Sequence, residues 1–293
     1  MLLHDLVSAN GGLVTTAQLR TVLSRRALAD YVHAGALVRV CHGVYAVEPP
    51  DVESRLRALE LMTGRPMVAC MATAADFYGF DTENDERLHV LDPSIRLRPG
   101  PDLVVHQRLG APLRKVRGRL MTAPAWTAVE VARALRRPRA LATLDAALRS
   151  QACSASEMEQ SVREQRGRRG IVKVRQLLAH ADARAESSME SETRLVFLDH
   201  GVPLPVLQYE IVDLTGRLWR LDFAWPDQKV AAEYDSMEWH ANPAAWKTDR
   251  IKAARLGELG WTLVPVVVDD VRRHPADLVA RISSRLGGAR LVG

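Results

Sequence analysis

The first fifty residues of the chain alternate between short apolar segments and turn residues. Leucine and valine recur at helical spacing along residues 2–9, and Asn10-Gly11-Gly12 then interrupts the pattern. Thr15 and Gln18 have the spacing of a capping box, in which each residue satisfies a backbone N–H near the start of a helix. This predicts that a second, short helix begins there.

A third helix and a hairpin follow. Ser24 is suited to cap the helix and Gly35 to end it. Leu28, Tyr31 and Val32 lie on one face of this helix, and Leu28 and Val32 should face the core. Residues 37–40 and 44–47 then read as two strands joined by a turn at Gly43. Three short helices followed by a hairpin within fifty residues is the element order of a winged helix-turn-helix.

The side of the third helix that faces away from this core offers candidate DNA contacts. These are Arg25, Arg26, Ala29 and His33. In a helix-turn-helix this side, near the helix N-terminus, lies in the major groove, where arginine reads guanine. Arg39 and His42 flank the hairpin turn and are expected to act as a wing against the DNA backbone. The alternative is a small helical domain that binds protein and leaves these side chains solvated.

Residues 51–183 show mixed patterns. Helices are predicted at 52–62, 69–78, 126–135 and 140–150, and short strands at 88–91 and 103–106. Residues 154–183 are predicted to be a connector of helix and loop.

From residue 184 the order of patterns becomes regular. A helix at 186–200 is followed by strands at 206–213, 218–224 and 230–235, a helix at 244–259, a strand at 262–268 and a helix at 271–286. This order predicts a mixed sheet flanked by helices. We therefore expect an α/β (α+β) chain with three domains: residues 1–50, 51–183 and 184–293.

Charge is unevenly distributed along the chain. The net charge is +5, but residues 96–183 hold eighteen Lys and Arg against seven Asp and Glu, whereas residues 184–293 hold fourteen against sixteen. Such asymmetry suggests a polyanionic partner for the middle of the chain. The alternatives are a solvated face or contact with a partner protein.

Composition excludes several classes of protein. Cys41, Cys70 and Cys153 are odd in number and widely spaced, which argues against a disulfide framework and a structural zinc site. No apolar run approaches the roughly 18 residues of a membrane span, and no basic leader precedes an apolar segment at the N-terminus. We expect a cytoplasmic protein with no membrane contact.

Carboxylates cluster in the predicted C-terminal sheet. If residues 225–228 connect two strands, Ala224 pairs with Lys229, and Asp222, Glu233 and Asp235 project from one face. Asp222 and Glu233 are then diagonal neighbours, within reach of one shared cation. Glu190, on the preceding helix, could add a further oxygen. Clustered carboxylates hold Mg²⁺, which activates water and stabilises the leaving oxygen in phosphodiester hydrolysis. The alternative is a half-exposed strand face without catalysis.

Residues 186–270 resemble the PD-(D/E)XK nuclease superfamily, and its very-short-patch-repair-like branch in particular. The matching motifs are Glu190-Ser191, Asp222-Phe223, Glu233-Tyr234-Asp235, His240, Asp249-Arg250, and Leu256 before Gly260-Trp261. The resemblance implies a restriction-endonuclease-like fold in which Asp222 and Glu233 hold metal and Asp235 or His240 assists.

The sequence departs from this nuclease pattern at two positions. Asp235 stands where the superfamily has lysine, and Ser236 stands where the branch usually has glycine. Lys247 or Lys252, from the following helix, are the candidates to replace the missing lysine. The departures bear on activity more than on fold.

Residues 1–150 resemble AbiEi-type antitoxins. The matching segments are Gly12-Leu13-Val14-Thr15-Thr16, Leu28, residues 35–40, Gly43-Val44-Tyr45, Ala72-Thr73-Ala74-Ala75, Phe77-Tyr78-Gly79, Val104–His106, Thr122-Ala123-Pro124 and Thr127. The resemblance implies a regulator that represses its own operon by binding double-stranded operator DNA and counters a nucleotidyltransferase-like toxin encoded nearby.

Three hypotheses about function follow. The first is an autorepressing antitoxin, which requires no cofactor to bind DNA. The second is a metal-dependent DNA endonuclease, with Mg²⁺ in the C-terminal domain, that the winged helix directs to its target. The third is a protein-interaction scaffold in which neither site functions. Each of the three hypotheses is compatible with a homodimer.

Overall fold

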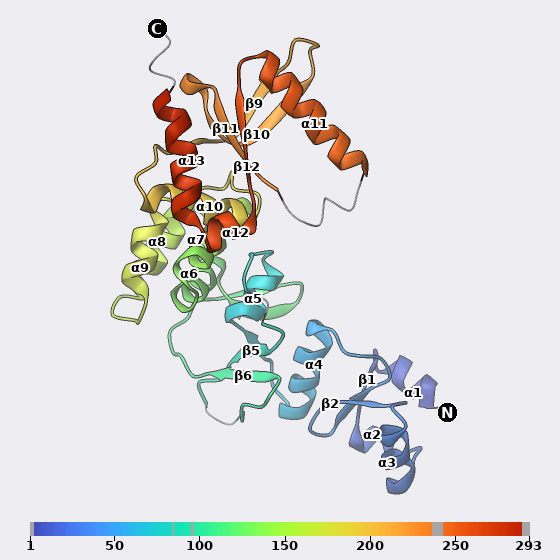
Figure 1. The fold of residues 1–293 in the computed structure, drawn as a ribbon. Helices are drawn as coiled ribbons and strands as arrows, with labels where there is room; N and C mark the ends of the chain where they lie inside the picture. Colours follow the sequence, from blue (N-terminus) through green and yellow to red (C-terminus); the bar gives the residue numbers. More distant parts are fainter. Residues whose placement is uncertain (1–2, 84, 95–96, 236–242, 289–293) are drawn as a thin grey trace. The chain divides into compact units, whose positions relative to one another are not determined.

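The structure, a computed structural model, describes residues 3–83, 85–94, 97–235 and 243–288 (Figure 1). It forms two compact units, Met1–Tyr78 with Asn84–Thr127, and Gly79–Glu83 with Ala128–Gly293. Helices and three separate sheets share the chain, which confirms the predicted α/β (α+β) class.

The first unit begins with a winged helix-turn-helix. Its elements are α1 (Leu3–Ala9), β1 (Leu13–Thr15), α2 (Thr16–Leu19), α3 (Arg25–His33), β2 (Val38–Cys41) and β3 (Val44–Ala46). The predicted hairpin, β2 and β3, is confirmed, but β1 adds a third strand and gives the antiparallel order β1-β3-β2. The sequence did not predict β1, because three residues are too few to show alternation.

Local signals in the sequence position α2 and α3. Thr15 and Gln18 form the predicted capping box: the Thr15 N–H donates to Gln18 Oε1 at 2.8 Å, and the Gln18 N–H donates to Thr15 Oγ1. Ser24 Oγ accepts from the Ala27 N–H at the start of α3. Leu28 of α3 is buried with apolar side chains of α1, β1 and α2, and Val32 packs against them as predicted, whereas Tyr31 is 37% exposed.

The remainder of the first unit is a five-stranded sheet with two helices. Its elements are α4 (Val52–Thr63), β4 (Val68–Ala69), α5 (Met71–Phe77), β5 (Leu88–Leu91), β6 (Leu103–His106), β7 (Leu113–Val116) and β8 (Arg119–Thr122). The strand order is β6-β5-β4-β8-β7. The bounds predicted for β5 and β6 are confirmed. The sequence missed β4, β7 and β8, and residue 69, predicted to begin a helix, ends β4.

The second unit combines a helical layer with a four-stranded mixed sheet. Its helices are α6 (Pro124–Ala134), α7 (Arg137–Arg149), α8 (Ala155–Glu164), α9 (Ile171–Leu178), α10 (Ser188–Asp199), α11 (Pro243–Glu258), α12 (Val268–Arg272) and α13 (Pro275–Gly288). Its strands are β9 (Val206–Val212), β10 (Leu218–Trp225), β11 (Val230–Tyr234) and β12 (Thr262–Val266), in the order β12-β11-β10-β9.

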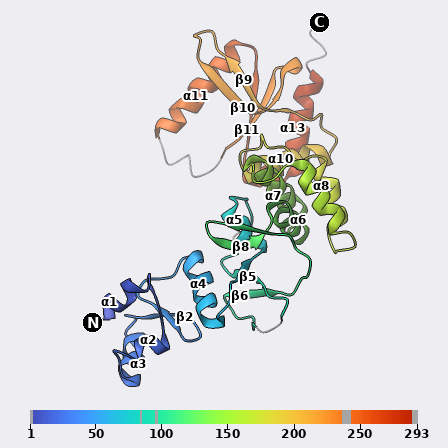
Figure 2. The ribbon, with the colours of Figure 1, turned by 180° about the vertical axis from the view of Figure 1, so that it is seen from behind.

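This mixed sheet is covered on both faces, as predicted. Only β11 and β12 are parallel; the other neighbouring strands are antiparallel. Leu256 of α11 packs on one face, and side chains of α10, α12 and α13 pack on the other. Figures 1 and 2 show where these helices lie relative to the strands. The final helix, predicted as one segment, is two, because Pro275 lacks the N–H that a continuous helix requires and instead begins α13.

Residues assigned by sequence to the middle domain pack against the C-terminal part. In α7, Asp145 is fully buried and pairs with Arg194 of α10 at 2.6 Å. Arg137 of α7 pairs with Asp199 of α10 at 2.7 Å. Helices α7 and α10 are therefore parts of one compact unit, and the division of the chain at residues 183/184 stays a prediction.

Two histidines lie in contact across β5 and β6. His89 Nδ1 lies 3.0 Å from His106 Nε2, their rings stack, and His89 Nε2 lies 2.9 Å from Asp85 Oδ2. Burial, together with the positive charges of His89 and Arg108, lowers the pKa of His106 to about 4. The Arg87 side chain holds the pKa of Asp85 well below its ordinary value.

We predict that His106 makes unfolding depend on pH. Its folded pKa of about 4 is below the ordinary 6.5, so the unfolded chain takes up the proton first as the pH falls. The stability tied to neutral His106 is complete above pH 6.5 and declines toward pH 4, by at most about 1.4 kcal/mol per pH unit.

Urea unfolding of the wild type and of His106→Gln at about pH 7 and about pH 4.5 measures this effect. The wild type should lose more stability on acidification than the variant. Equal losses in the two proteins would contradict the assignment of the effect to His106.

Candidate nucleic-acid interface and carboxylate cluster

Helix α3 presents an open polar face. Arg25, Arg26, Ala29 and His33 are all exposed, on the side opposite the buried Leu28. The side chains of Arg25 and Arg26 make no hydrogen bond or ion pair with any other residue that the structure describes. They are therefore free to meet a ligand, and the predicted orientation of the helix is confirmed.

The predicted wing is the turn between β2 and β3. Arg39 and His42 are exposed, and Arg39 Nη2 lies 3.1 Å from His42 Nδ1. Gly43 supplies the left-handed conformation that the turn requires, with φ of +74°. The structure thus brings Arg39 and His42 together at one end of the small sheet.

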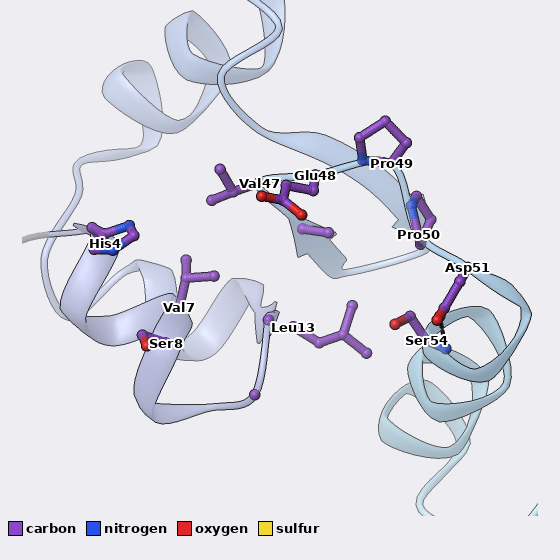
Figure 3. A pocket seen from close by; sticks show the side chains of 13 residues that line it. His4, Val7, Ser8, Leu13, Val47, Glu48, Pro49, Pro50, Asp51 and Ser54 are labelled. Atoms are coloured by element: carbon purple, nitrogen blue, oxygen red, sulfur yellow. Dashed lines mark hydrogen bonds between the residues drawn. The ribbon is translucent and has the colours of Figure 1, made fainter.

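A pocket lies beside the winged helix (Figure 3). Its volume is about 670 Å³, and α1, the ends of β1 and β3, and the start of α4 line it. Val7 and Leu13 form an apolar floor, while Glu48 and Asp51 give an acidic rim. None of the six candidate DNA contacts lines this pocket, so it is separate from the predicted interface.

Part of the basic excess in residues 96–183 is neutralised within the fold. Five of its arginines pair with acids from outside that segment: Arg117 with Glu53, Arg119 with Glu60, Arg136 with Glu83, Arg137 with Asp199, and Arg139 with Asp81 and Glu192. Around α8 and α9, Arg166, Arg169 and Arg175 are exposed, with side chains that no described acid pairs. Arg114 and Lys115 of β7 are likewise exposed without a described acidic partner, so the remaining basic side chains are not confined to these two helices.

The strand register in the C-terminal sheet differs from the prediction. Ala224 pairs with Ala231 and Trp225 with Val230, not Ala224 with Lys229. The reason is the connection itself: residues 226–228 form a 3₁₀ turn, and Lys229 adopts a left-handed φ of +51° within it. Continuing the observed register places Asp222 opposite Glu233 instead of diagonal to it.

Asp222 and Glu233 are the half-buried centre of the carboxylate cluster. Asp222 Oδ2 accepts from the Tyr234 N–H at 3.0 Å, and Lys252 of α11 forms an ion pair with Glu233. Lys252 also donates to the Arg220 carbonyl at 2.7 Å. Burial raises the pKa of both carboxyls, while the charge of Lys252 opposes that rise.

Glu190 lies near Asp222 but is engaged at the start of α10. Its carboxylate accepts from the Glu186 N–H, Ser187 Oγ and Gln208 Nε2, each at 2.9 Å. The Glu190 carboxylate thus satisfies a backbone N–H and a hydroxyl at the helix N-terminus. Burial raises the pKa of Glu190, and the negative charge of Asp222 adds to that rise.

Two further predicted catalytic residues are Asp235 and His240. Asp235 lies directly after β11, where its N–H donates to the Val266 carbonyl, and His240 lies outside the described residues. Within the described ranges, no group of three or more His, Cys, Asp or Glu is arranged to hold a metal ion. Metal binding by Glu190, Asp222 and Glu233 stays a prediction.

Sequence reasoning missed two residues of this cluster. Gln208 reaches Glu190 from β9, and Arg220 pairs with Glu186 at 2.6 Å. The left-handed φ of Gln208, +51°, leaves no signature in a sequence. Arg220 could have been found from its place two residues before Asp222 on the same strand face.

Family profiles match two separate parts of the chain. Residues 1–47 match the family described as "Transcriptional regulator, AbiEi antitoxin", and residues 67–180 match "AbiEi antitoxin C-terminal domain". The chain belongs to the AbiEi antitoxin family. Neither profile extends over the mixed sheet β9–β12, so family membership rests on the winged helix and on the segment from β4 to α9.

Two further proteins are similar to this AbiEi-family chain over most of its length. Two uncharacterized proteins of Mycobacterium tuberculosis, from strains CDC 1551 and H37Rv, are each 61% identical to it over 271 residues. The match covers 92% of this chain and all of each relative. The similarity therefore includes the C-terminal sheet that the family profiles leave out. Among the described helices, none has the length and apolarity to cross a bilayer.

We predict that Lys252 stabilises the folded state by neutralising Glu233. Both side chains are half-buried, so Lys252→Gln leaves a desolvated carboxylate without its counter-charge. The expected loss is about 1–3 kcal/mol of unfolding free energy at neutral pH, measured by urea titration.

Two variants control this measurement. Lys247→Gln, on the exposed part of the same helix, should change stability little. Glu233→Gln combined with Lys252→Gln should recover part of the loss, because the unpaired charge is gone. No recovery in the double variant would show that Lys252 acts through other contacts.

Proposed function

We propose that this AbiEi-family chain is an autorepressor and the antitoxin of a toxin–antitoxin pair. The observation that carries the proposal is the exposed, unpaired face of α3 within a complete winged helix. The match of residues 67–180 to an antitoxin domain supports the second role. A helix of this kind reads base edges in the major groove of double-stranded DNA.

In the proposed complex, Arg25 and Arg26 contact base edges or phosphates, and Ala29 and His33 lie further along the same groove. Arg39 and His42 form the wing against the backbone. The target is the operator of the chain's own gene.

The proposed toxin partner is a nucleotidyltransferase-like protein encoded nearby. The segment from β4 to α9 matches the antitoxin domain and carries the exposed arginines of α8 and α9. These side chains offer a cationic surface to an acidic partner or extend the contact with DNA. Co-expression with the adjacent gene product, scored by growth, distinguishes a neutralising antitoxin from a repressor alone.

The first test of the proposal is operator binding by Arg25→Ala and Arg26→Ala. Loss of an arginine that reads a base should cost about 1–3 kcal/mol and relax sequence preference, whereas loss of a phosphate contact should weaken all sequences alike. Titration of the promoter fragment and of a scrambled fragment measures both effects.

Arg285→Ala, on α13, is the matched control and should leave the affinity unchanged. Unchanged affinity in the Arg25→Ala/Arg26→Ala double variant would remove α3 from the interface. That outcome would favour the scaffold hypothesis, in which the winged helix binds protein.

The second candidate function is a DNA endonuclease in the C-terminal part. One observation favours it: Lys252 of α11 forms an ion pair with Glu233. Lys252 could therefore replace the lysine that the nuclease superfamily has at the position of Asp235. Against it, Glu190 is engaged at a helix start and Asp222 is hydrogen-bonded to the backbone. We propose a restriction-endonuclease-like fold that retains weak affinity for Mg²⁺ with little or no cleavage.

Supercoiled plasmid and linear duplex, each incubated with the protein in Mg²⁺ and in Mn²⁺, test this proposal. We expect both substrates to stay intact, because Asp235 places a negative charge where the superfamily has the lysine that stabilises the attacking water or the transition state. Cleavage that disappears in Asp222→Ala and in Glu233→Ala would overturn this expectation and establish the nuclease.

A further inference from the structure

The pocket beside the winged helix has the size and the walls of a small-molecule site (Figure 3). Its volume of about 670 Å³ lies within the range of roughly 300–1,000 Å³ that is usual for such sites. Helix α1 lies on one side of it and the start of α4 on the other, with the end of β3 between them. A molecule bound there would not occupy the predicted DNA interface, because none of the six candidate DNA contacts is among the described residues that line the pocket.

Hydrogen bonds within the first unit hold two walls of this pocket together. Arg57 of α4 donates to the Asn10 carbonyl at 2.8 Å and to the Gly11 carbonyl at 3.1 Å, and so joins α4 to the turn that follows α1. Gly11 permits this close contact, because a Cβ at its position would lie 2.5 Å from Arg57 Nη1. The pocket is therefore largely formed before a ligand arrives, which reduces the entropic cost of binding.

Buried apolar side chains form the floor of the pocket. Val7 of α1, Leu13 of β1 and Ala46 of β3 are all buried. Val47, which is 39% exposed, extends this apolar surface toward the rim. Val7 also packs in the core cluster that contains Leu28 of α3, so the floor is part of the core of the winged helix. The apolar body of a ligand would leave water on contact with this floor.

The charge of the lining is negative. Among the described residues that line the pocket, Glu48 and Asp51 are acidic and none is lysine or arginine. No described side chain forms an ion pair with Glu48. Asp51 Oδ1 accepts from the Ser54 N–H at 2.8 Å, and this hydrogen bond lowers the pKa of the Asp51 carboxyl, which is therefore ionised at neutral pH. Two carboxylates above an apolar floor attract cations and repel phosphates.

We propose that this pocket binds an amphipathic organic cation, whose apolar body lies on Val7 and Leu13 and whose ammonium group lies at Glu48 and Asp51. A metal ion would leave the apolar floor uncovered, and a neutral apolar molecule would give the two carboxylates no counter-charge. The floor and the rim thus select a ligand together. Binding at this site does not depend on the proposed operator binding.

Three probes separate the contribution of the rim from that of the floor. Phenylbutylamine and phenylbutyrate have the same apolar body and opposite charges at about pH 7, whereas butylamine has the positive charge without the ring. Ligand-observed NMR titrations of the full-length chain at low salt measure their affinities. Phenylbutylamine should bind at least about tenfold more tightly than each of the other two.

Variants of the lining test where phenylbutylamine binds. Glu48→Gln combined with Asp51→Asn removes both charges and keeps the cap of α4, because asparagine also caps helices; it should weaken binding at least about fivefold. Ser8→Trp, at an exposed position of α1 in the lining, should fill the pocket and abolish binding. Asp30→Asn, an exposed acid of α3 outside the lining, is the matched control and should leave the affinity unchanged.

Circular dichroism of each variant shows whether the fold is kept. The proposal would be overturned by phenylbutylamine that does not bind, or that binds no more tightly than phenylbutyrate. An affinity that stays the same in the folded Glu48→Gln/Asp51→Asn variant would overturn it as well, because binding would then lie elsewhere on the chain.

Discussion

The buried ion pair between Asp145 and Arg194 holds the second unit together. Asp145 is fully buried on α7, and Arg194 reaches it from α10 while also donating to the His180 carbonyl. The other oxygen of Asp145 accepts from the Asp182 N–H at 2.8 Å. Burying two charges is favourable only when each is paired and hydrogen-bonded, as here. The pair therefore joins the antitoxin-like helices to the helix that begins the C-terminal part.

Ion pairs between distant parts of the chain also explain why counting charges along the sequence overestimates the basic excess of residues 96–183. Arginines in residues 96–183 pair with acids far away in the chain, so part of the local excess is neutralised, even where the side chains stay exposed as in Arg136 and Arg137. Such pairing depends on tertiary contacts that no local window contains. Among the described residues, the exposed basic side chains that no acid pairs, on β7 and around α9, are fewer than the sequence suggests.

What could be predicted depended on the length of each signal. The caps at Thr15 and Ser24, the exposed face of α3, and strands β5 and β6 follow from local spacing, and the structure has them where predicted. Strands β1 and β4 are too short for alternation to appear. The register of β10 and β11 could not be predicted, because it depends on the left-handed conformation of Lys229. That conformation is set by the turn and not by the residue type.

The carboxylate cluster shows the same limit at the level of single side chains. Lys247 and Lys252 were equal candidates from sequence, because the choice requires the rotation of α11 relative to the sheet. Leu256 settles that rotation: it is fully buried against Leu221 and Ala231, and Lys252 lies one turn earlier on the same face. Packing of an apolar residue thus determines which cation meets Glu233. A sequence pattern can name the charged groups of a site, but the core beneath them decides which ones meet.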